Sequence, residues 1–505
     1  MGIHDISLYD VLARNALIYE NRPAWYEAEE DRLLTYGELK SEVDRWAARL
    51  QAAGLIQGGR VGLIGKNSLA YFLVCGAAAA LGAMVVPINW RLSAAEAAFN
   101  LNDVDPFLVL AESDDPAWLN DIQAQLSAGI GCYNLLAEDG LLQNLPSPDD
   151  ASLDAAAAAR VRTDDGAVII HTAAVAGRPR GAVLSHGNMI WANLHLMQGL
   201  GVGPETVYLN VLPLFHVGGL CVTWMALHLG ALVVNVRKFD APQALALIAR
   251  HKASLMFEFA PMLDALLAEQ ERTGLDISSM TKVAGLDAPQ TIERYQQLTG
   301  GTYYSLYGQT ETAMVVSLGS YNACPGAAGR PLPLTRIAIV DDDDRPVADG
   351  GTGEIVIQGP MVFKGYWGLA GETEMVFRNG WHHTGDLGRL DEQGYLWYGG
   401  RKPEKELIKP GGENVYPAEV ENVILQHPAV DAVVVFGVPD PKWKEGIMAV
   451  CRLKSGQALM AEALIAFVGE RIARYKRPHY VEFVSELALK SDGQVDREAV
   501  KKQYA

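Results

Sequence analysis

Cysteine and positive charge are both scarce in this chain. Its 505 residues include five cysteines, and none of them has C-x-x-C spacing: Cys75, Cys132, Cys221, Cys324 and Cys451. This scatter excludes a disulfide framework and a zinc site, and it fits a reducing cytosol. The 42 lysines and arginines are outnumbered by 60 aspartates and glutamates, which gives a formal charge of −18. A nucleic-acid partner is therefore not expected, because such binding requires a basic face.

Targeting signals are also lacking. Residues 1–20 contain no basic segment followed by an apolar run, so no secretory signal is expected. Ile6 stands where a myristoylation signal has Ser or Thr, and residues 503–505 are not a peroxisomal address. Residues 67–90 carry no charge and are long enough to span a bilayer. Glycines and a proline interrupt that stretch, so we predict a buried helix and strand, no transmembrane segment, and a cytoplasmic location.

The chain does have length and a regular alternation of elements. It exceeds what one core usually supports, so two or more domains are expected. Apolar residues recur at helical spacing from Leu39 to Leu50 behind a capping box that starts at Thr35, and a strand is expected at 61–64. A strand, a helix and a strand (232–236, 242–251 and 253–257) repeat this alternation. The pattern predicts an α/β fold with largely parallel sheets.

Three motifs stand in an order that fits a nucleotide site. Tyr307-Gly308-Gln309-Thr310-Glu311 follows Pro213-Leu214-Phe215-His216-Val217-Gly218-Gly219 and precedes Thr384-Gly385-Asp386 and Arg401. Tyr307 offers an aromatic face to a purine, and Gly308 lets a ligand approach the backbone. Thr310 and Glu311 offer oxygens suited to phosphate and Mg²⁺. Asp386 can accept ribose hydroxyls, and Arg401 can donate to the same sugar or to a phosphate.

With these motifs the chain resembles the adenylate-forming superfamily, which includes acyl-CoA synthetases, adenylation domains of peptide synthetases and beetle luciferases. The resemblance runs from about Tyr36 to about Arg497. It implies an α/β fold: a large N-terminal domain of mixed sheets flanked by helices (1–400) and a small α+β C-terminal domain (401–505). The C-terminal domain is expected to rotate on a hinge at about 402–406. The pivot falls on Pro403 or Lys405, and Lys405 is favoured because a proline restricts φ.

The resemblance also implies the substrates ATP and CoA, with Mg²⁺ as the metal. Phosphates are expected on the loop 171–181, through Thr172, backbone N–H groups and Arg178 or Arg180, beside a helix that starts near Ser185 with its N–H groups facing outward. Arg180 replaces the usual lysine, and most of the usual hydroxyls are missing from this loop. Mg²⁺ is expected on Glu311 and Thr172. Adenine is expected on a strand end formed by Asp287, Ala288 and Pro289.

The acid is expected near His216, which in the family lies between the two substrates. The pocket candidates are mostly apolar, so a hydrophobic acid is favoured over a dicarboxylate; its chain length and the presence of an aromatic ring stay open. The pocket candidates are Phe215, Phe257, Leu286, Gln309 and Met314, with Trp191, Phe259, Met262 and Val315 as further contributors. Gly411, Gly412 and Glu413 match the loop that lines the pantetheine tunnel of CoA.

Residues 341–344 form a run of four acidic side chains, which we predict to be a solvated loop.

One catalytic position departs from the family. Where the resemblance places a lysine, this chain has Gln494, and the loss of one oriented donor costs about 10² to 10³ in rate. Lys490 is the nearest cation that could replace it. Three alternatives to such a replacement stay open: a weak first half-reaction, a different native substrate, or a deliberate change at this position.

The predicted function is an acyl-CoA synthetase with His216, Glu311 and Lys490 as catalytic residues. It would activate a carboxylic acid with ATP to an acyl-adenylate and transfer the acyl group to CoA. One alternative is an enzyme that loads a carrier-protein thiol. The other is a nucleotide- or acyl-CoA-binding homologue with impaired adenylation, which Gln494 and the altered loop at 173–176 favour. The oligomeric state stays open, a homodimer included.

Overall fold

The structure is a computed structural model that describes residues 2–135, 160–172, 179–402, 406–489 and 495–505. Several predictions lie outside these residues: the expected hinge residues Pro403 and Lys405, and Lys490 and Gln494. Two compact units are distinguished. The first comprises Met1–Trp90, Asn100–His171 and Gly181–Gly400, and the second comprises Arg91–Phe99, Thr172–Arg180 and Arg401–Ala505. Because two short inner segments group with the second unit, the predicted division at residue 400 stays a prediction.

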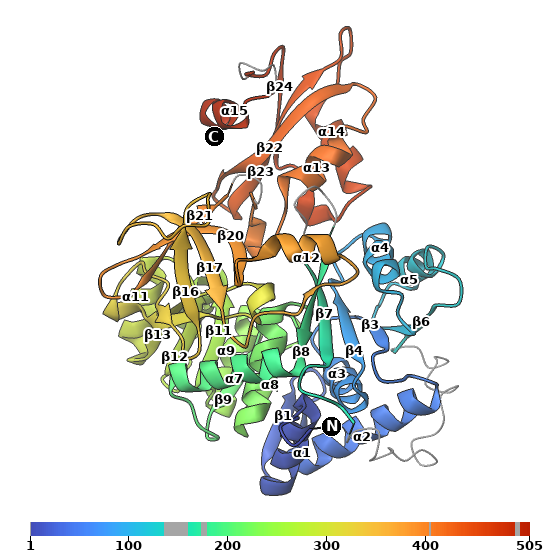
Figure 1. The fold of residues 1–505 in the computed structure, drawn as a ribbon, viewed down its shortest axis with the longest axis vertical. Coiled ribbons are helices and arrows are strands. Elements are labelled where there is room, and N and C mark those ends of the chain that lie inside the picture. Colours follow the sequence, from blue (N-terminus) through green and yellow to red (C-terminus); the bar gives the residue numbers. More distant parts are fainter. Residues whose placement is uncertain (1, 136–159, 173–178, 403–405, 490–494) are drawn as a thin grey trace. The chain divides into compact units, whose positions relative to one another are not determined.

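The first unit is built around a sheet whose described strands run in the order β15-β14-β13-β12-β11-β9-β10-β1-β2. Strands β13, β12, β11 and β9 of this sheet are labelled in Figure 1. The strands from β13 to β1 are parallel to one another, and antiparallel strands extend both edges. Their bounds are β1 Pro23–Glu27, β2 Arg32–Thr35, β9 Val207–Asn210, β10 Leu232–Asn235, β11 Leu255–Phe259, β12 Lys282–Leu286, β13 Thr302–Tyr307, β14 Ser317–Ser320 and β15 Arg330–Pro331.

Residues 60–401 form two more sheets. Over the described residues one has the order β18-β8-β7-β4-β3-β5-β6, and the other has the order β16-β17-β20-β19, with β21 paired to β20. The bounds are β3 Arg60–Ile64, β4 Met84–Ile88, β5 Leu108–Ala111, β6 Gly131–Asn134, β7 Gly166–Thr172, β8 Arg180–Ser185, β18 Gly365–Tyr366, β16 Arg336–Val340, β17 Gly353–Gln358, β19 Phe377–Arg378, β20 Trp381–Leu390 and β21 Leu396–Arg401.

Helices cover both faces of the larger sheet because its parallel strands are buried on both sides. One face packs with α8, and the opposite face packs with α9, α10 and α11. Within the described part of the N-terminal 400 residues, the α-helices are α1 Leu8–Ile18, α2 Tyr36–Ala52, α3 Leu69–Leu81, α4 Ala94–Val104, α5 Pro116–Gln123, α7 His186–Leu200, α8 Val217–Leu229, α9 Ala241–His251, α10 Met262–Thr273, α11 Pro289–Thr299 and α12 Ala370–Val376.

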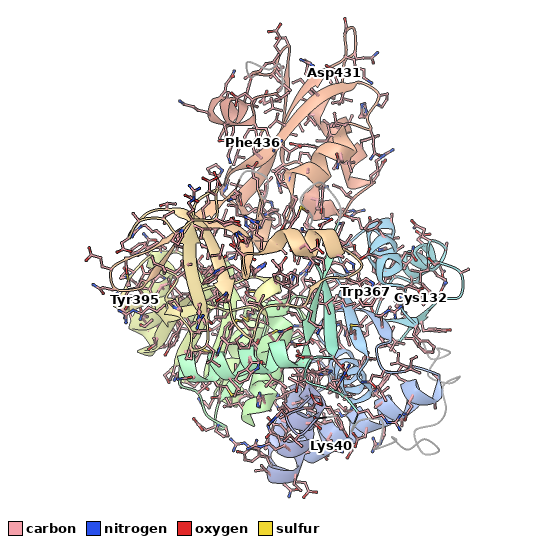
Figure 2. All side chains as sticks on the ribbon, in the orientation of Figure 1. Lys40, Cys132, Trp367, Tyr395, Asp431 and Phe436 are labelled. Atoms are coloured by element: carbon pink, nitrogen blue, oxygen red, sulfur yellow. The ribbon has the colours of Figure 1, made fainter. Side chains whose placement is uncertain are left out.

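The second unit has its own sheet, in the order β22-β23-β24 over the described residues. Phe436 on β22, labelled in Figure 2, is buried in a small apolar cluster of this unit. The elements are α13 Pro417–Ile424, β22 Val430–Asp440, β23 Lys444–Leu453, α14 Ala461–Gly469, β24 Tyr480–Val484 and α15 Arg497–Tyr504. The predicted α/β fold, with a large N-terminal and a small C-terminal part, is confirmed.

The local predictions are mostly confirmed. Helix α2 starts at the predicted capping box, with Thr35 accepting from the Glu38 N–H and Glu38 accepting from the Thr35 N–H. Stretch 67–90 forms the buried helix α3 and strand β4. Among the helices of the described chain, none is long and apolar enough to cross a membrane. The strand predicted at 253–257 instead spans Leu255–Phe259, because Lys252 ends α9 in the left-handed region and two residues connect it to the sheet.

The charge run at 341–344 is only partly a solvated loop. Arg378 on β19 donates to both carboxylate oxygens of Asp344, at 2.8 and 3.0 Å. This contact holds the pKa of Asp344 below its usual value. The prediction was wrong at Asp344, because β19 brings in a guanidinium from a distant part of the sequence.

Candidate active site

The larger sheet has a switch point, where the connections from two neighbouring strands run to opposite sides of the sheet. From β9 the chain passes through α8 to β10 on one side, and from β11 it passes through α10 to β12 on the other side. Strands β9 and β11 are neighbours, and the helices that follow them pack on opposite faces. In open α/β sheets, ligands bind outside the carboxyl ends of the strands at such a point. Of the predicted site residues, His216 follows β9, Asp287 follows β12 and Glu311 follows β13, so these three share this edge.

His216 lies just after β9 and forms the N-cap of α8. The turn before it is tight: the His216 N–H donates to the Pro213 carbonyl at 3.1 Å. A Cβ atom at Gly219 would lie 2.2 Å from the same carbonyl oxygen, so only glycine fits there. The His216 ring is half-buried, and its centroid lies 4.4 Å from that of Phe215.

The ends of β11 and β12 lie close together. A Cβ atom at Gly285 would come within 2.0 Å of the Glu258 carbonyl oxygen, so Gly285 allows this close approach. After β12, the Asp287 carboxylate accepts from the Ala288 N–H at 2.6 Å, and Pro289 begins α11. The predicted pocket residues Phe215, Phe257 and Met314 are buried, whereas Leu286 is 47% exposed.

Tyr307 and Asp386 meet although they come from distant parts of the sequence. Tyr307 ends β13 and Asp386 lies on β20; the Tyr307 hydroxyl donates to Asp386 Oδ2 at 2.7 Å. Both side chains are buried. Burial, with the nearby Asp386 charge, raises the pKa of Tyr307 well above its ordinary value, so the phenol keeps its proton. The motif at 307–311 and the motif Thr384-Gly385-Asp386 are therefore joined by a short buried hydrogen bond.

Gln309 strengthens this junction. Its side-chain amide Nε2 donates to Asp386 Oδ2 and to the Thr384 carbonyl, the latter at 3.1 Å. Its Oε1 lies 3.4 Å from Nε2 of His382, a buried residue that the sequence did not point to. The amide of Gln309 thus links the central motif to the strand that carries Asp386.

Glu311 is held by a second residue that the sequence did not point to. The hydroxyl of Tyr366 donates to Glu311 Oε1 at 2.8 Å, and the Phe363 N–H donates to the Glu311 carbonyl at 2.8 Å. Glu311 is buried, on a short 3₁₀ turn, Thr310–Thr312. Tyr366 follows Gly365 on β18, and Gly365 has a φ of 133°. Nothing in the sequence around Tyr366 connects it with Glu311.

Gly308 packs closely against a nearby part of its own chain. A Cβ atom there would lie 1.8 Å from the carbonyl oxygen of Met314, so packing alone requires a glycine, and the approach of a ligand to this backbone stays a prediction. The turn that follows is strained, because Ala313 and Met314 have φ values of 49° and 93°. Such strain persists only where the surroundings hold it, as at many functional sites.

The expectation that the N–H groups at the start of α7 face outward is contradicted, whereas the phosphate role of the loop 171–181 stays a prediction. The Ser185 and Asn188 side chains accept from each other's N–H groups in a capping box. The N–H groups of His186 and Gly187 donate to the carbonyls of Asp165 and Thr163. These backbone donors are therefore occupied by the protein. The start of α7 was predicted correctly. The sequence around Ser185 gives no sign that carbonyl groups just before β7 accept from its N–H groups.

The remaining predicted residues belong to the second unit. Thr172 and Arg180 flank the loop residues outside the described chain, and the Thr172 hydroxyl lies 3.4 Å from the Arg180 carbonyl. Arg401 ends β21, and Gly411, Gly412 and Glu413 follow within this unit. Gly411 has a φ of 59°, and a Cβ there would lie 3.1 Å from the Trp443 ring. Their assignments to sugar, phosphate and CoA stay predictions.

No group of three or more His, Cys, Asp or Glu side chains able to hold a metal occurs among the residues that the structure describes. The predicted Mg²⁺ site needs few protein ligands, since Mg²⁺ keeps several waters and binds phosphates. Glu311 and Thr172 therefore stay predicted ligands.

Comparison with known proteins decides the family. The profile of AMP-binding enzymes matches residues 12–367, and the profile of the AMP-binding enzyme C-terminal domain matches residues 419–494. The chain belongs to the AMP-binding enzyme family. The predicted resemblance to adenylate-forming enzymes is confirmed.

Relatives of this family member cover nearly its full length. It is 34% identical over 486 residues to an indoleacetate–CoA ligase of Aromatoleum aromaticum, with 94% of each chain covered. It is 33% identical over 477 residues to a feruloyl-CoA synthase of an Amycolatopsis species, covering 93% of this chain and 94% of the relative. A solved double mutant of o-succinylbenzoate CoA synthetase from Bacillus subtilis, bound with a product analogue, matches 99% of both chains with 28% identity and a TM-score of 0.86.

Proposed function

We propose that this AMP-forming acid–CoA ligase activates a hydrophobic monocarboxylic acid with ATP and transfers the acyl group to CoA. The observation that carries the proposal is the buried junction of Tyr307, Gln309 and Asp386 beside Glu311, at the carboxyl edge of the parallel sheet. This junction unites motifs from distant parts of the chain. Ligases named for indoleacetate, ferulate and fatty acids among the relatives support the substrate class.

The residues present fit a nucleotide with its metal. Asp386 is a carboxylate that already receives hydroxyl and amide donors on one oxygen, and ribose hydroxyls are donors of the same kind. Glu311, with Thr172, would hold Mg²⁺, which when bound neutralises phosphate charge. Asp287, Ala288 and Pro289 would border adenine, Thr310 and Arg180 the phosphates, and Arg401 the sugar.

Two displacements then follow. A carboxylate oxygen of the acid attacks the α-phosphorus of ATP, the bond to the bridging oxygen breaks, and pyrophosphate leaves. The sulfur of CoA, having lost its proton, attacks the carbonyl carbon of the acyl-adenylate, the acyl C–O bond of this mixed anhydride breaks, and AMP leaves with its electron pair. Protein groups contribute mainly position and charge, because both reactants of the first step are anions. His216 would orient the acid, Lys490 would supply the cation missing at Gln494, and Gly411, Gly412 and Glu413 would border the pantetheine arm.

Apolar walls support a hydrophobic acid. The buried side chains of Phe215, Phe257 and Met314 offer no hydrogen-bond partner to a second carboxylate on the acid. Burial of even a neutral polar group without a partner costs about 2 to 7 kcal/mol, and burial of a charged group costs more. We also propose a cytoplasmic location, supported by the five free cysteines of the chain.

An acid panel tests the proposal. ATP–pyrophosphate exchange would be measured with indoleacetate, ferulate, octanoate and a succinylbenzoate, and acyl-CoA formation would be measured after free CoA is added. We expect exchange that depends on one of the monocarboxylates and an acyl-CoA product. Exchange without acyl-CoA would favour the carrier-protein enzyme. ATP binding without any exchange would favour the homologue with impaired adenylation.

A further inference from the structure

Asn67 has no place in the proposed reaction, yet its side chain is fully engaged close to His216. It lies between β3 and α3 in the first unit and is 3% exposed. Its Nδ2 donates to the carbonyls of Leu212 and Val236, at 2.9 and 3.1 Å. Its Oδ1 accepts from the Leu214 N–H at 2.8 Å. One amide thus ties together the segments that follow β9 and β10.

These contacts control the segment that carries His216. Leu214 precedes His216 by two residues, and the turn between them leaves little room because Gly219 packs against the Pro213 carbonyl. A shift of Leu214 must therefore move the His216 backbone. The backbone N–H of Asn67 donates to the Arg237 carbonyl at 3.1 Å, so the amide is itself anchored to the sheet.

We propose that Asn67 is a positioning residue for His216 in the acid-activating step. The inference rests on the proposed function in one respect, namely that His216 contacts the acid. Only an amide of this length offers two donors and one acceptor to these three backbone groups. Alanine would leave all three buried groups unsatisfied, so the segment would shift to find new partners.

A double-mutant cycle distinguishes positioning from stability. Exchange would be measured with the best acid of the panel in the wild type, Asn67→Ala, His216→Ala and the double variant. We expect Asn67→Ala to lower the rate about 10- to 100-fold, since small displacements at a reacting centre cost that much, while KM for ATP changes by less than about twofold. In the His216→Ala background the same change should alter the rate by less than about threefold. Equal factors in both backgrounds would overturn the inference and leave the proposed function intact.

Asn15→Ala is the matched control. Asn15 is also buried, and its amide donates to the carbonyls of Leu227 and His228 at the opposite end of α8, at 2.6 and 2.8 Å. It should give the same factor with and without His216. Asn67→Ser, whose hydroxyl keeps a donor and an acceptor but is too short to reach all three backbone groups, replaces Asn67→Ala if that variant does not fold.

A second measurement is independent of activity. Amide hydrogen exchange of residues 212–217 should speed up more than about tenfold in Asn67→Ala and stay unchanged in Asn15→Ala. Absence of pyrophosphate exchange in the wild type would count against the proposed function, and the amide exchange then decides whether Asn67 holds the segment of His216. A full rate in His216→Ala would overturn the inference, because His216 would then have no part in the acid-activating step. Unchanged amide exchange in Asn67→Ala would overturn it.

Discussion

Glu27 is a buried carboxylate whose charge should make the stability of this protein depend on pH. It ends β1 and is 2% exposed. Its oxygens accept from the Trp25 indole N–H at 3.1 Å and from the Asn235 amide at 3.1 and 3.2 Å. The Leu69 N–H, in the first turn of α3, also donates to it. Burial outweighs these donors and raises the pKa of Glu27 to about 7.

The size of the effect follows from that pKa. The ordinary value is 4.5, and the difference of about 2.5 corresponds to about 3 kcal/mol at about 1.4 kcal/mol per pH unit. The folded pKa lies above the unfolded one, so the folded state binds more protons between the two values. The stability linked to Glu27 is therefore fully present below pH 4.5, and it is lost as the pH rises to about 7.

The perturbation is Glu27→Gln, which removes the titration. The side-chain NH₂ of the new glutamine would face N–H donors from Trp25, Asn235 and Leu69. A destabilisation that does not change with pH is therefore expected as well. Urea unfolding of both proteins would be followed by tryptophan fluorescence between about pH 5 and 8. The wild-type free energy of unfolding minus that of the variant should fall by about 2 to 3 kcal/mol over this range. Glu30→Gln, which alters an exposed neighbouring carboxylate, should leave that difference nearly flat. A flat difference for Glu27→Gln, or one that rises with pH, would refute the reasoning.

Three further predictions concern the site. Asp386→Ala should weaken ATP binding about tenfold by titration calorimetry, a loss of about 1.4 kcal/mol typical of hydrogen bonds to a charged group; unchanged affinity would remove Asp386 from the sugar. Tyr366→Phe deletes the hydroxyl that holds Glu311 and should raise the Mg²⁺ concentration for half-maximal exchange severalfold, whereas an identical Mg²⁺ titration would argue against Glu311 as a ligand. Gln494→Lys should speed adenylation about 10²-fold in single-turnover assays, and no gain together with a large loss in Lys490→Ala would assign the cation to Lys490.

Local chemistry explains why several elements could be predicted. The capping box at Thr35, the apolar spacing of α2 and the glycine that ends α3 act over a few residues, so they can be read in one dimension. The motifs around Tyr307 and Asp386 could be recognised for the same reason, because each is a short run with its own chemistry.

Partners that come from distant segments could not be predicted in this way. Two such contacts are the hydrogen bond from Tyr366 to Glu311 and the ion pair between Arg378 and Asp344, which depend on which strands become neighbours. The occupied donors at the start of α7 are a further case, since their acceptors lie before β7. A residue pattern carries no measure of these distances.

By itself the sequence determined the class of fold, the order of strands and helices, and the set of motifs, since propensity, periodicity and capping are short-range effects. Only the tertiary structure decided that Asn67 holds the segment of His216, that Gln309 turns to Asp386, and that Glu27 is buried against the first turn of α3. The physical reason is that packing selects one arrangement of the sheets, and hydrogen bonds between their ends form only after that selection is made.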